Sequence, residues 1–232
     1  MQYNDFCRQT LQKDAPDLYA ISLMAKQASQ THALWAVFAF HHEIRQTRTR
    51  VSEPTLGLIR LQWWRDEVEK IYAGQPVAAS EVLAALADAI AQYNVPQDML
   101  LAMITPFEDE LRAETPPKTV DEVLEILSHV HTPVLKIASF ITGTQDQDDI
   151  YKAVAQNRGL IDVLQRAQPQ SIVAQQAQAF KDAFAHKVGA QGRIIKAFQS
   201  YSALTYSRIE KGCVPAHHPN TPLILWTNLL FQ

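Results

Sequence analysis

The sequence predicts an all-α protein built as a single domain. Apolar residues recur three and four positions apart along almost the whole chain, which is the spacing of amphipathic helices. The 232 residues include only 7 glycines, so few turns with positive φ are expected. No stretch shows the period-2 alternation of a strand, and neither a fixed-length repeat nor a long linker is evident. We therefore expect one helical bundle over residues 1–232, with a mobile tail from about residue 215.

Local signals place the first helices. The apolar spacing predicts a helix from Asp17 and a second over residues 30–48. Ser52 is expected to cap a third helix, which tolerates Pro54 in its first turn and ends near Gly74.

Two further helices are expected in the middle of the chain. Ser80 and Pro96 each precede an apolar pattern of helical period, and Pro106 is expected to kink the second of these helices. The run Thr115-Pro116-Pro117 interrupts the pattern and predicts a break.

The C-terminal half opens with a capping box. Thr119 and Glu122 are spaced so that each side chain can bind the other's backbone N–H. The helix that follows should bend at Pro133 and end at Gly143. Further helices are predicted over residues 148–167, 170–187 and 193–211.

Bulk composition restricts the class of function. The formal net charge is −3 and the pI is about 6.2, so no nucleic-acid partner is expected. Cys7, near an N-terminus expected to be mobile, and Cys213 are too far apart in sequence to suggest a disulfide framework. The chain shows no signal-peptide core and no apolar run of roughly 20 residues. We expect a cytoplasmic protein and leave open a peripheral contact with the inner membrane.

Two stretches carry a family resemblance. The helix from Leu34 to Phe40 leads into Glu43-Ile44, and the next helix contains Gly57-Leu58-Ile59-Arg60-Leu61-Gln62-Trp63-Trp64. Together they resemble the squalene/phytoene synthase family, most strongly over residues 31–73. The resemblance implies an isoprenoid-synthase-like helical bundle around an apolar cavity, in which two aspartate-rich motifs hold Mg²⁺ against a leaving diphosphate.

Both metal motifs depart from the family pattern. At the first motif, the acidic stretch is replaced by Arg45-Gln46-Thr47-Arg48-Thr49, which leaves only Glu43 nearby. At the second motif, residues 159–170 keep a single acid, Asp162. Because Mg²⁺ prefers carboxylate and water oxygens, we predict no metal site and no cofactor, with Mg²⁺ required only if the chain is an enzyme.

The same departures resemble a divergent branch of the family, whose mitochondrial members assist the assembly of respiratory complex I. The matching residues are Ala39, Phe40, Glu43, Ser52, Glu53, Thr55, Gly57 and Arg60. The resemblance implies a non-catalytic homologue that contacts respiratory complex subunits or assembly intermediates, or that binds an isoprenoid or lipid. The alternative is a Mg²⁺-dependent prenyltransferase that joins two prenyl diphosphates.

No catalytic residue is assigned, but a set of candidate ligand-binding residues follows from the resemblance. They are Glu43, Arg45, Arg48, Arg60, Trp63, Trp64, Asp162 and Arg166. The arginines that follow Glu43 could pair with phosphate oxygens, although we favour a solvated helix end. Trp63 and Trp64 could line an isoprenoid pocket or be ordinary core.

Other polar residues are given structural interpretations. His41 and His42 are adjacent on a helix and point about 100° apart, so they cannot easily bind one ion together. The charged residues of 60–67 predict either buried ion pairs, a partner surface or an exposed network. The acidic cluster over residues 108–114 is interpreted as solvated surface.

Overall fold

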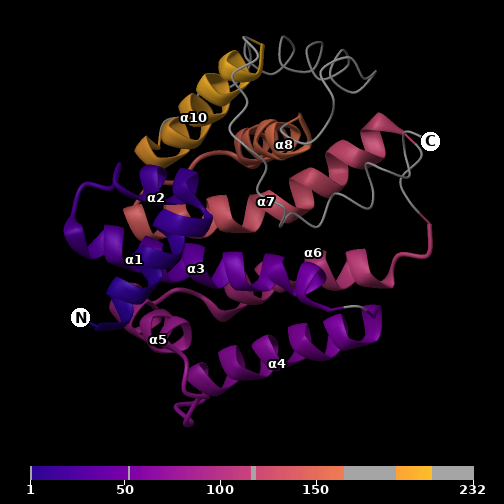
Figure 1. The fold of residues 1–232 in the computed structure, drawn as a ribbon. Coiled ribbons are helices and arrows are strands. Elements are labelled where there is room, and N and C mark those ends of the chain that lie inside the picture. Colours follow the sequence, from indigo (N-terminus) through magenta and orange to yellow (C-terminus); the bar gives the residue numbers. More distant parts are fainter. Residues whose placement is uncertain (1, 52, 116–118, 165–191, 211–232) are drawn as a thin grey trace.

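The computed structural model describes residues 2–51, 53–115, 119–164 and 192–210, and within these ranges every element of regular secondary structure is an α-helix (Figure 1). The helices are α1 (Gln2–Asp14), α2 (Pro16–Ser22), α3 (Ala28–Arg50), α4 (Pro54–Tyr72), α5 (Glu81–Tyr93), α6 (Gln97–Arg112), α7 (Val120–Thr142), α8 (Asp148–Leu164) and α10 (Arg193–Glu210). The all-α prediction is therefore confirmed. The helix predicted over 170–187, the tail from 215 and Cys213 lie outside the described residues.

Helix α3 runs through the centre of the bundle. Residues 33–42 are all buried, and α3 packs against α1, α2, α4, α5, α6 and α7 (Figure 1). Two aromatic pairs join it to its neighbours: Phe38 meets Phe198 of α10 edge-on at 6.0 Å, and Phe40 meets Trp64 of α4 edge-on at 5.6 Å. A helix buried on all sides needs apolar residues around its whole circumference, which is the pattern of this segment.

Several predicted helix ends are confirmed. The Ser80 hydroxyl accepts the Leu83 N–H at 3.4 Å, and Thr119 forms the predicted capping box with Glu122. Gly143 ends α7 with a φ of 68°, a conformation that glycine adopts without the strain of a Cβ. Pro106 and Pro133 lie inside α6 and α7, which both continue past them.

Two expectations about helix starts are wrong. We expected a mobile N-terminus and a first helix from Asp17, but residues 2–14 form α1, in which Cys7 and Leu11 are fully buried. This burial raises the pKa of the Cys7 thiol to about 12. This helix has few apolar residues, so its burial depends on contact with α3 and α5. The N-cap residue of α4 is Glu53, whose side chain makes no capping hydrogen bond, and the predicted cap Ser52 lies outside the described residues.

Helices α7 and α8 pack closely, because α8 has a glycine at the contact. A Cβ on Gly159 would lie 2.6 Å from Cβ of Leu127, which is fully buried. Such a contact cannot be relieved by rotating the leucine side chain, so one helix would have to move.

We expect Gly159→Ala to lower the free energy of unfolding by about 1–3 kcal/mol through overpacking, as measured by urea denaturation. Gly57→Ala is the matched control, because its added Cβ would meet the flexible end of Leu111 at 2.7 Å. The control should cost less. Equal stability of Gly159→Ala and the unmodified chain would contradict this account of the α7–α8 contact.

Candidate functional site

The C-terminal half of α3 carries the stretch in which the family resemblance places metal-binding acids. Its side chains divide into two groups: His41, His42 and Gln46 are buried, whereas Glu43 and Arg45 are half-buried. The helix therefore directs imidazole and amide groups into the bundle and keeps its carboxylate and guanidinium groups nearer the boundary with solvent.

Glu43 is bound by two arginines. Arg50, two turns along the same helix, donates to the Glu43 carboxylate from Nη1 at 2.6 Å and from Nη2 at 3.5 Å. Nη2 of Arg60 on α4 lies 4.0 Å from the same carboxylate. The Glu43 side chain is only 18% exposed, so its charge is compensated by this α3–α4 cluster rather than by water.

The described oxygen donors do not fit Mg²⁺. A Mg²⁺ ion at Glu43 would have to displace Arg50 and Arg60, and positions 45–49 supply no further carboxylate. Within the described residues, no group of three or more His, Cys, Asp or Glu side chains could hold one ion. The described residues therefore do not form a metal site in which several carboxylates share one ion.

The second motif helix is separated from the first. Helix α7 packs on both α3 and α8 and lies between them in Figure 1. Asp162 belongs to α8, but its side chain is not among those described, and Arg166 lies outside the described residues. The Arg48 side chain is likewise not described, so its role as a candidate ligand-binding residue stays a prediction.

An ion pair beside the second motif was missed by sequence reasoning. Arg158 of α8 donates from Nη2 to the carboxylate of Asp17 on α2, and both side chains are largely buried. The Arg158 guanidinium also lies over the Tyr201 ring of α10, 5.9 Å from its centroid. The two partners are 141 residues apart, and no local pattern in the sequence connects them.

The three candidate residues on α4 share one region but differ in burial. Trp64 is buried in the core, whereas Trp63 is 39% exposed, and their rings meet at 4.7 Å. Arg60, one turn earlier, reaches back to Glu43. Trp64 therefore contributes to the core, while Trp63 and Arg60 remain accessible to a ligand or partner.

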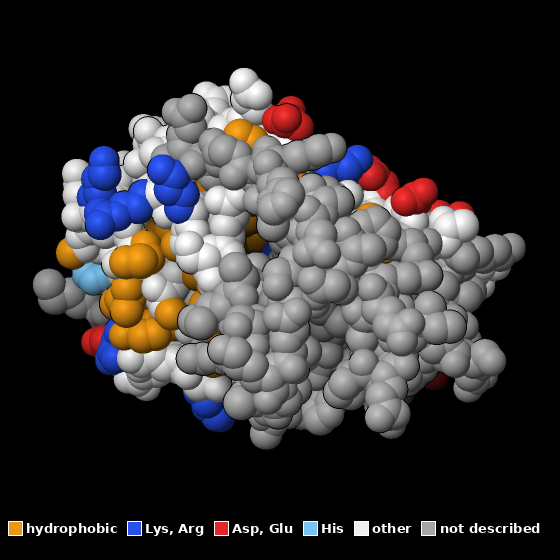
Figure 2. Space-filling view, turned by 90° about the horizontal axis from the view of Figure 1, so that it is seen from above, with side chains coloured by type: hydrophobic (Ala, Val, Ile, Leu, Met, Phe, Trp, Pro, Cys, Tyr) orange, Lys and Arg blue, Asp and Glu red, His pale blue; other side chains and the backbone are white. Residues whose placement is uncertain are grey.

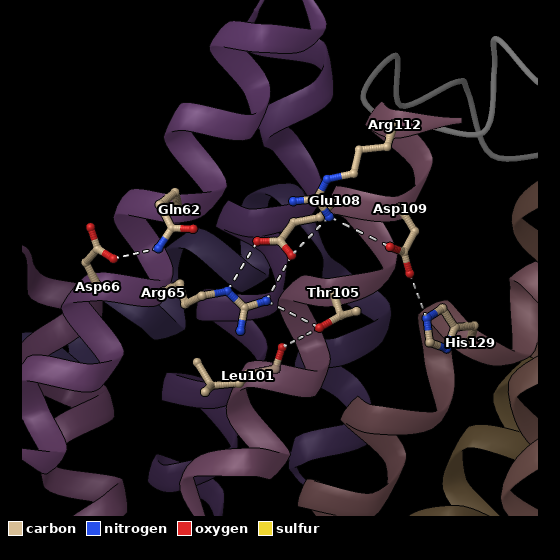
Figure 3. Close-up of polar contacts among 9 residues, drawn as sticks. All are labelled: Gln62, Arg65, Asp66, Leu101, Thr105, Glu108, Asp109, Arg112 and His129. Atoms are coloured by element: carbon tan, nitrogen blue, oxygen red, sulfur yellow. Dashed lines mark hydrogen bonds and ion pairs between the residues drawn. The ribbon is translucent and has the colours of Figure 1, made fainter. Parts of the chain in front are cut away.

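A second charged network joins α4, α6 and α7 (Figure 3). Arg65 binds Glu108 through two contacts, Nε–Oε1 at 3.3 Å and Nη2–Oε2 at 2.9 Å, and also donates to Thr105 at 3.3 Å. Glu108 is buried, so this member of the acidic cluster is an interhelical ion pair rather than the solvated surface that we expected. Of the alternatives for residues 60–67, Arg65 thus forms the buried pair.

The network continues to the surface of α7. Arg112 lies 3.6 Å from Glu108 and 3.9 Å from Asp109, and Asp109 contacts Nε2 of His129 at 3.3 Å. A groove of about 390 Å³ lies between α6 and α7, with Pro106, Ala113, Ile126 and Val130 as its apolar lining and Asp109, Glu110, Glu125 and His129 as its polar lining. None of the eight candidate residues is among its described lining.

The buried position of His42 affects its protonation. Burial lowers the pKa of His42 below its ordinary value of 6.5, and although Glu43 opposes this effect, Arg45 and Arg50 add to it. The side-chain amide of Gln46 donates to Nε2 of the neutral ring. His42 is thus a neutral polar residue of the core, in agreement with its structural interpretation.

Comparison with known proteins identifies a matching family model and several similar proteins. A model of the squalene/phytoene synthase family matches residues 11–189. Proteins of Bos taurus and Homo sapiens, both named NADH dehydrogenase (ubiquinone) complex I, assembly factor 6, are 27% and 26% identical over 166 residues. The matched region is 71% of this chain and 49% of each relative, so the chain spans about half the length of the curated relatives it matches.

Solved structures share the fold. The squalene synthase HpnC from Alicyclobacillus acidocaldarius superposes with a TM-score of 0.67 at 16% identity, over 90% of this chain and 92% of that one. A dehydrosqualene synthase in complex with ligand superposes with a TM-score of 0.69 at 13% identity, over 99% and 94%. At these identities the likeness concerns the fold, and it confirms the predicted isoprenoid-synthase-like bundle.

We expect His42→Gln to make folding less sensitive to acid. The unfolded chain protonates His42 near pH 6.5, whereas the folded chain does so only at lower pH, so stability falls as the pH drops below about 6.5. Removing this group should reduce the loss by up to about 1.4 kcal/mol per pH unit in that window. Urea denaturation at pH 7.5 and 5.5 measures the difference, with exposed His32→Gln as the histidine control. An unchanged pH dependence for His42→Gln would contradict the assignment.

Proposed function

The chain belongs to the squalene/phytoene synthase family, and we propose that it is a non-catalytic member that assists the assembly of respiratory complex I. The named relatives support this role, since the Bos taurus and Homo sapiens proteins are called complex I assembly factors. Its partners would be complex I subunits or assembly intermediates, which it would contact as a rigid helical scaffold.

The observation that carries the proposal is the pairing of Glu43. At the position where an enzyme of this family would present carboxylates to Mg²⁺, the carboxylate of Glu43 instead accepts from Arg50 and lies near Arg60. Neutralising a leaving diphosphate is the task that the metals perform in such chemistry. Because the Glu43 carboxylate already neutralises arginines, it is not available to bind the Mg²⁺ ions that would neutralise a diphosphate.

We include a peripheral membrane contact in this proposal. No described helix is both long and apolar enough to cross a bilayer. A factor that acts on a membrane-bound complex needs access to the membrane surface, which a protein can obtain through exposed apolar and cationic side chains.

The alternative function is a prenyltransferase that joins two prenyl diphosphates. One observation favours it: Arg60 and Arg50 present guanidinium groups that are 40% exposed and suited to paired hydrogen bonds with phosphate oxygens. In that alternative Arg45 and Arg48 would join them, with Trp63 beside the prenyl chain. A lipid-binding role without turnover would use the same residues, and an isoprenoid co-purifying with the chain would support it.

Deleting the gene in its own host should lower the amount of assembled complex I, as seen by native gel electrophoresis. Re-expression should restore it, and Glu43→Gln should restore it equally, because the proposal requires the fold and not a metal-binding carboxylate. Normal complex I after deletion would overturn the assembly role. If Glu43→Gln accumulated normally yet failed to restore complex I, the role of this site would have to be revised.

The purified chain, incubated with Mg²⁺ and farnesyl or geranylgeranyl diphosphate, should release no diphosphate above the rate without protein. Circular dichroism of the same sample establishes that it is folded. Diphosphate release that is lost in Glu43→Ala would favour the prenyltransferase and show that a sparse set of carboxylates suffices. Release that persists in Glu43→Ala would place the chemistry elsewhere.

A further inference from the structure

An apolar surface lies at the edge of the bundle, on the outer side of α2. Four apolar residues at helical spacing, Pro16, Ala20, Leu23 and Met24, are all exposed there. The two large side chains, Leu23 and Met24, are 48% and 43% exposed. Figure 2, which looks onto the top of the bundle, shows apolar side chains gathered on the left with lysine and arginine side chains beside them. We call this region the α2 face.

The cations next to the α2 face come from two segments far apart in the sequence. Lys26 follows α2, and Arg193 and Lys196 lie one turn apart on the exposed side of α10, which packs on α2. Further contacts hold these segments together: Gln30 of α3 donates to the carbonyl of Ile141, and the N–H of Gly192 donates to Asp146 in the loop that follows α7. The α10 cations are thus fixed beside the end of α2.

Among the described residues, the acidic groups next to this region in sequence or contact are Asp14, Asp17 and Asp146, and Asp146 accepts the N–H of Gly192. Residues 18–33 and 193–202 contain no aspartate or glutamate, and Asp17 of α2 is bound to Arg158. The chain as a whole has a net charge of −3, so this local excess of positive charge is not a reflection of composition. Apolar side chains at the centre with cations at the border match the interface of an anionic bilayer.

We propose that the α2 face docks onto the surface of a membrane that contains anionic phospholipids. The α2 face lies at the edge of the bundle (Figure 1), so a flat lipid surface can contact it. Leu23 and Met24 enter the boundary between headgroups and acyl chains, while Lys26, Arg193 and Lys196 contact lipid phosphates. The inference rests on the membrane contact proposed above, but not on the assembly role or on the absence of catalysis.

The test is flotation of the full chain with vesicles of phosphatidylcholine, with and without one-third phosphatidylglycerol. The chain should float with the anionic vesicles only, and less so as salt rises from 0.1 to 0.5 M. Arg193→Gln combined with Lys196→Gln should weaken vesicle binding about thirtyfold, because each cation near an anionic surface raises the affinity roughly fivefold. Leu23→Ser combined with Met24→Ser should weaken it about tenfold.

Matched controls separate this face from general effects. Leu56→Ser with Ile59→Ser removes two apolar side chains, 47% and 62% exposed, from α4 on the opposite side of the bundle (Figure 1). Arg8→Gln with Arg112→Gln removes one cation from α1 and one from α6. Both controls should bind vesicles as the unmodified chain does.

Three results would overturn the proposal. They are no flotation by the unmodified chain, equal binding to neutral vesicles, and equal losses in the controls. A dimer in sedimentation experiments that Leu23→Ser with Met24→Ser converts to a monomer would assign the α2 face to a second copy instead. Because vesicle binding needs neither complex I nor prenyl diphosphates, its failure is distinguishable from failure of the assembly role.

Discussion

The burial of α3 on every side is the constraint on which the rest of this structure depends. Within the described residues, α1, α2, α4, α5, α6 and α7 pack on α3, and α10 meets it through Phe198. The apolar segment of α3 from Ala33 to Phe40 therefore fixes where each of these helices can lie. The same burial forces the polar residues that follow to find partners within the protein. His42 meets this demand by remaining neutral and bonding Gln46, and Glu43 meets it by binding arginines at the end of the helix.

Besides the burial of α3, the structure repeatedly pairs a carboxylate on one helix with an arginine on another. Glu43 joins α3 to α4, Glu108 joins α6 to α4, and Asp17 joins α2 to α8. The two largely buried pairs, Glu108–Arg65 and Asp17–Arg158, add little net stability, because desolvation offsets their attraction, but removing one partner is costly. They therefore serve to fix which helices meet. A carboxylate used in this way is not available to a metal ion, which links the packing of this bundle to its proposed lack of catalysis.

The charges at the surface are unevenly distributed. Acidic residues of α6 and α7, among them Asp109 and Glu125, line the groove between those helices and pair there with Arg112 and Lys152, whereas cations border the α2 face. A chain with a small net charge can in this way carry one surface suited to anionic lipid and another suited to a different partner. Such an arrangement would suit the membrane contact and the assembly role that we propose.

The helical pattern of apolar residues, together with local chemistry at helix ends, was sufficient to predict the all-α bundle and most helix boundaries. Ser80, Thr119 and Gly143 act through neighbours within a few residues, so their roles were readable without a fold. Helix α1 could not be predicted in this way. It has few apolar residues, and these are buried only by contact with α3 and α5. The substitution of arginines for acids at the first motif was likewise plain in the sequence. Which arginine binds which acid was decided by the tertiary structure, since Arg158 and Asp17, or Arg65 and Glu108, meet only when helices distant in the sequence pack together.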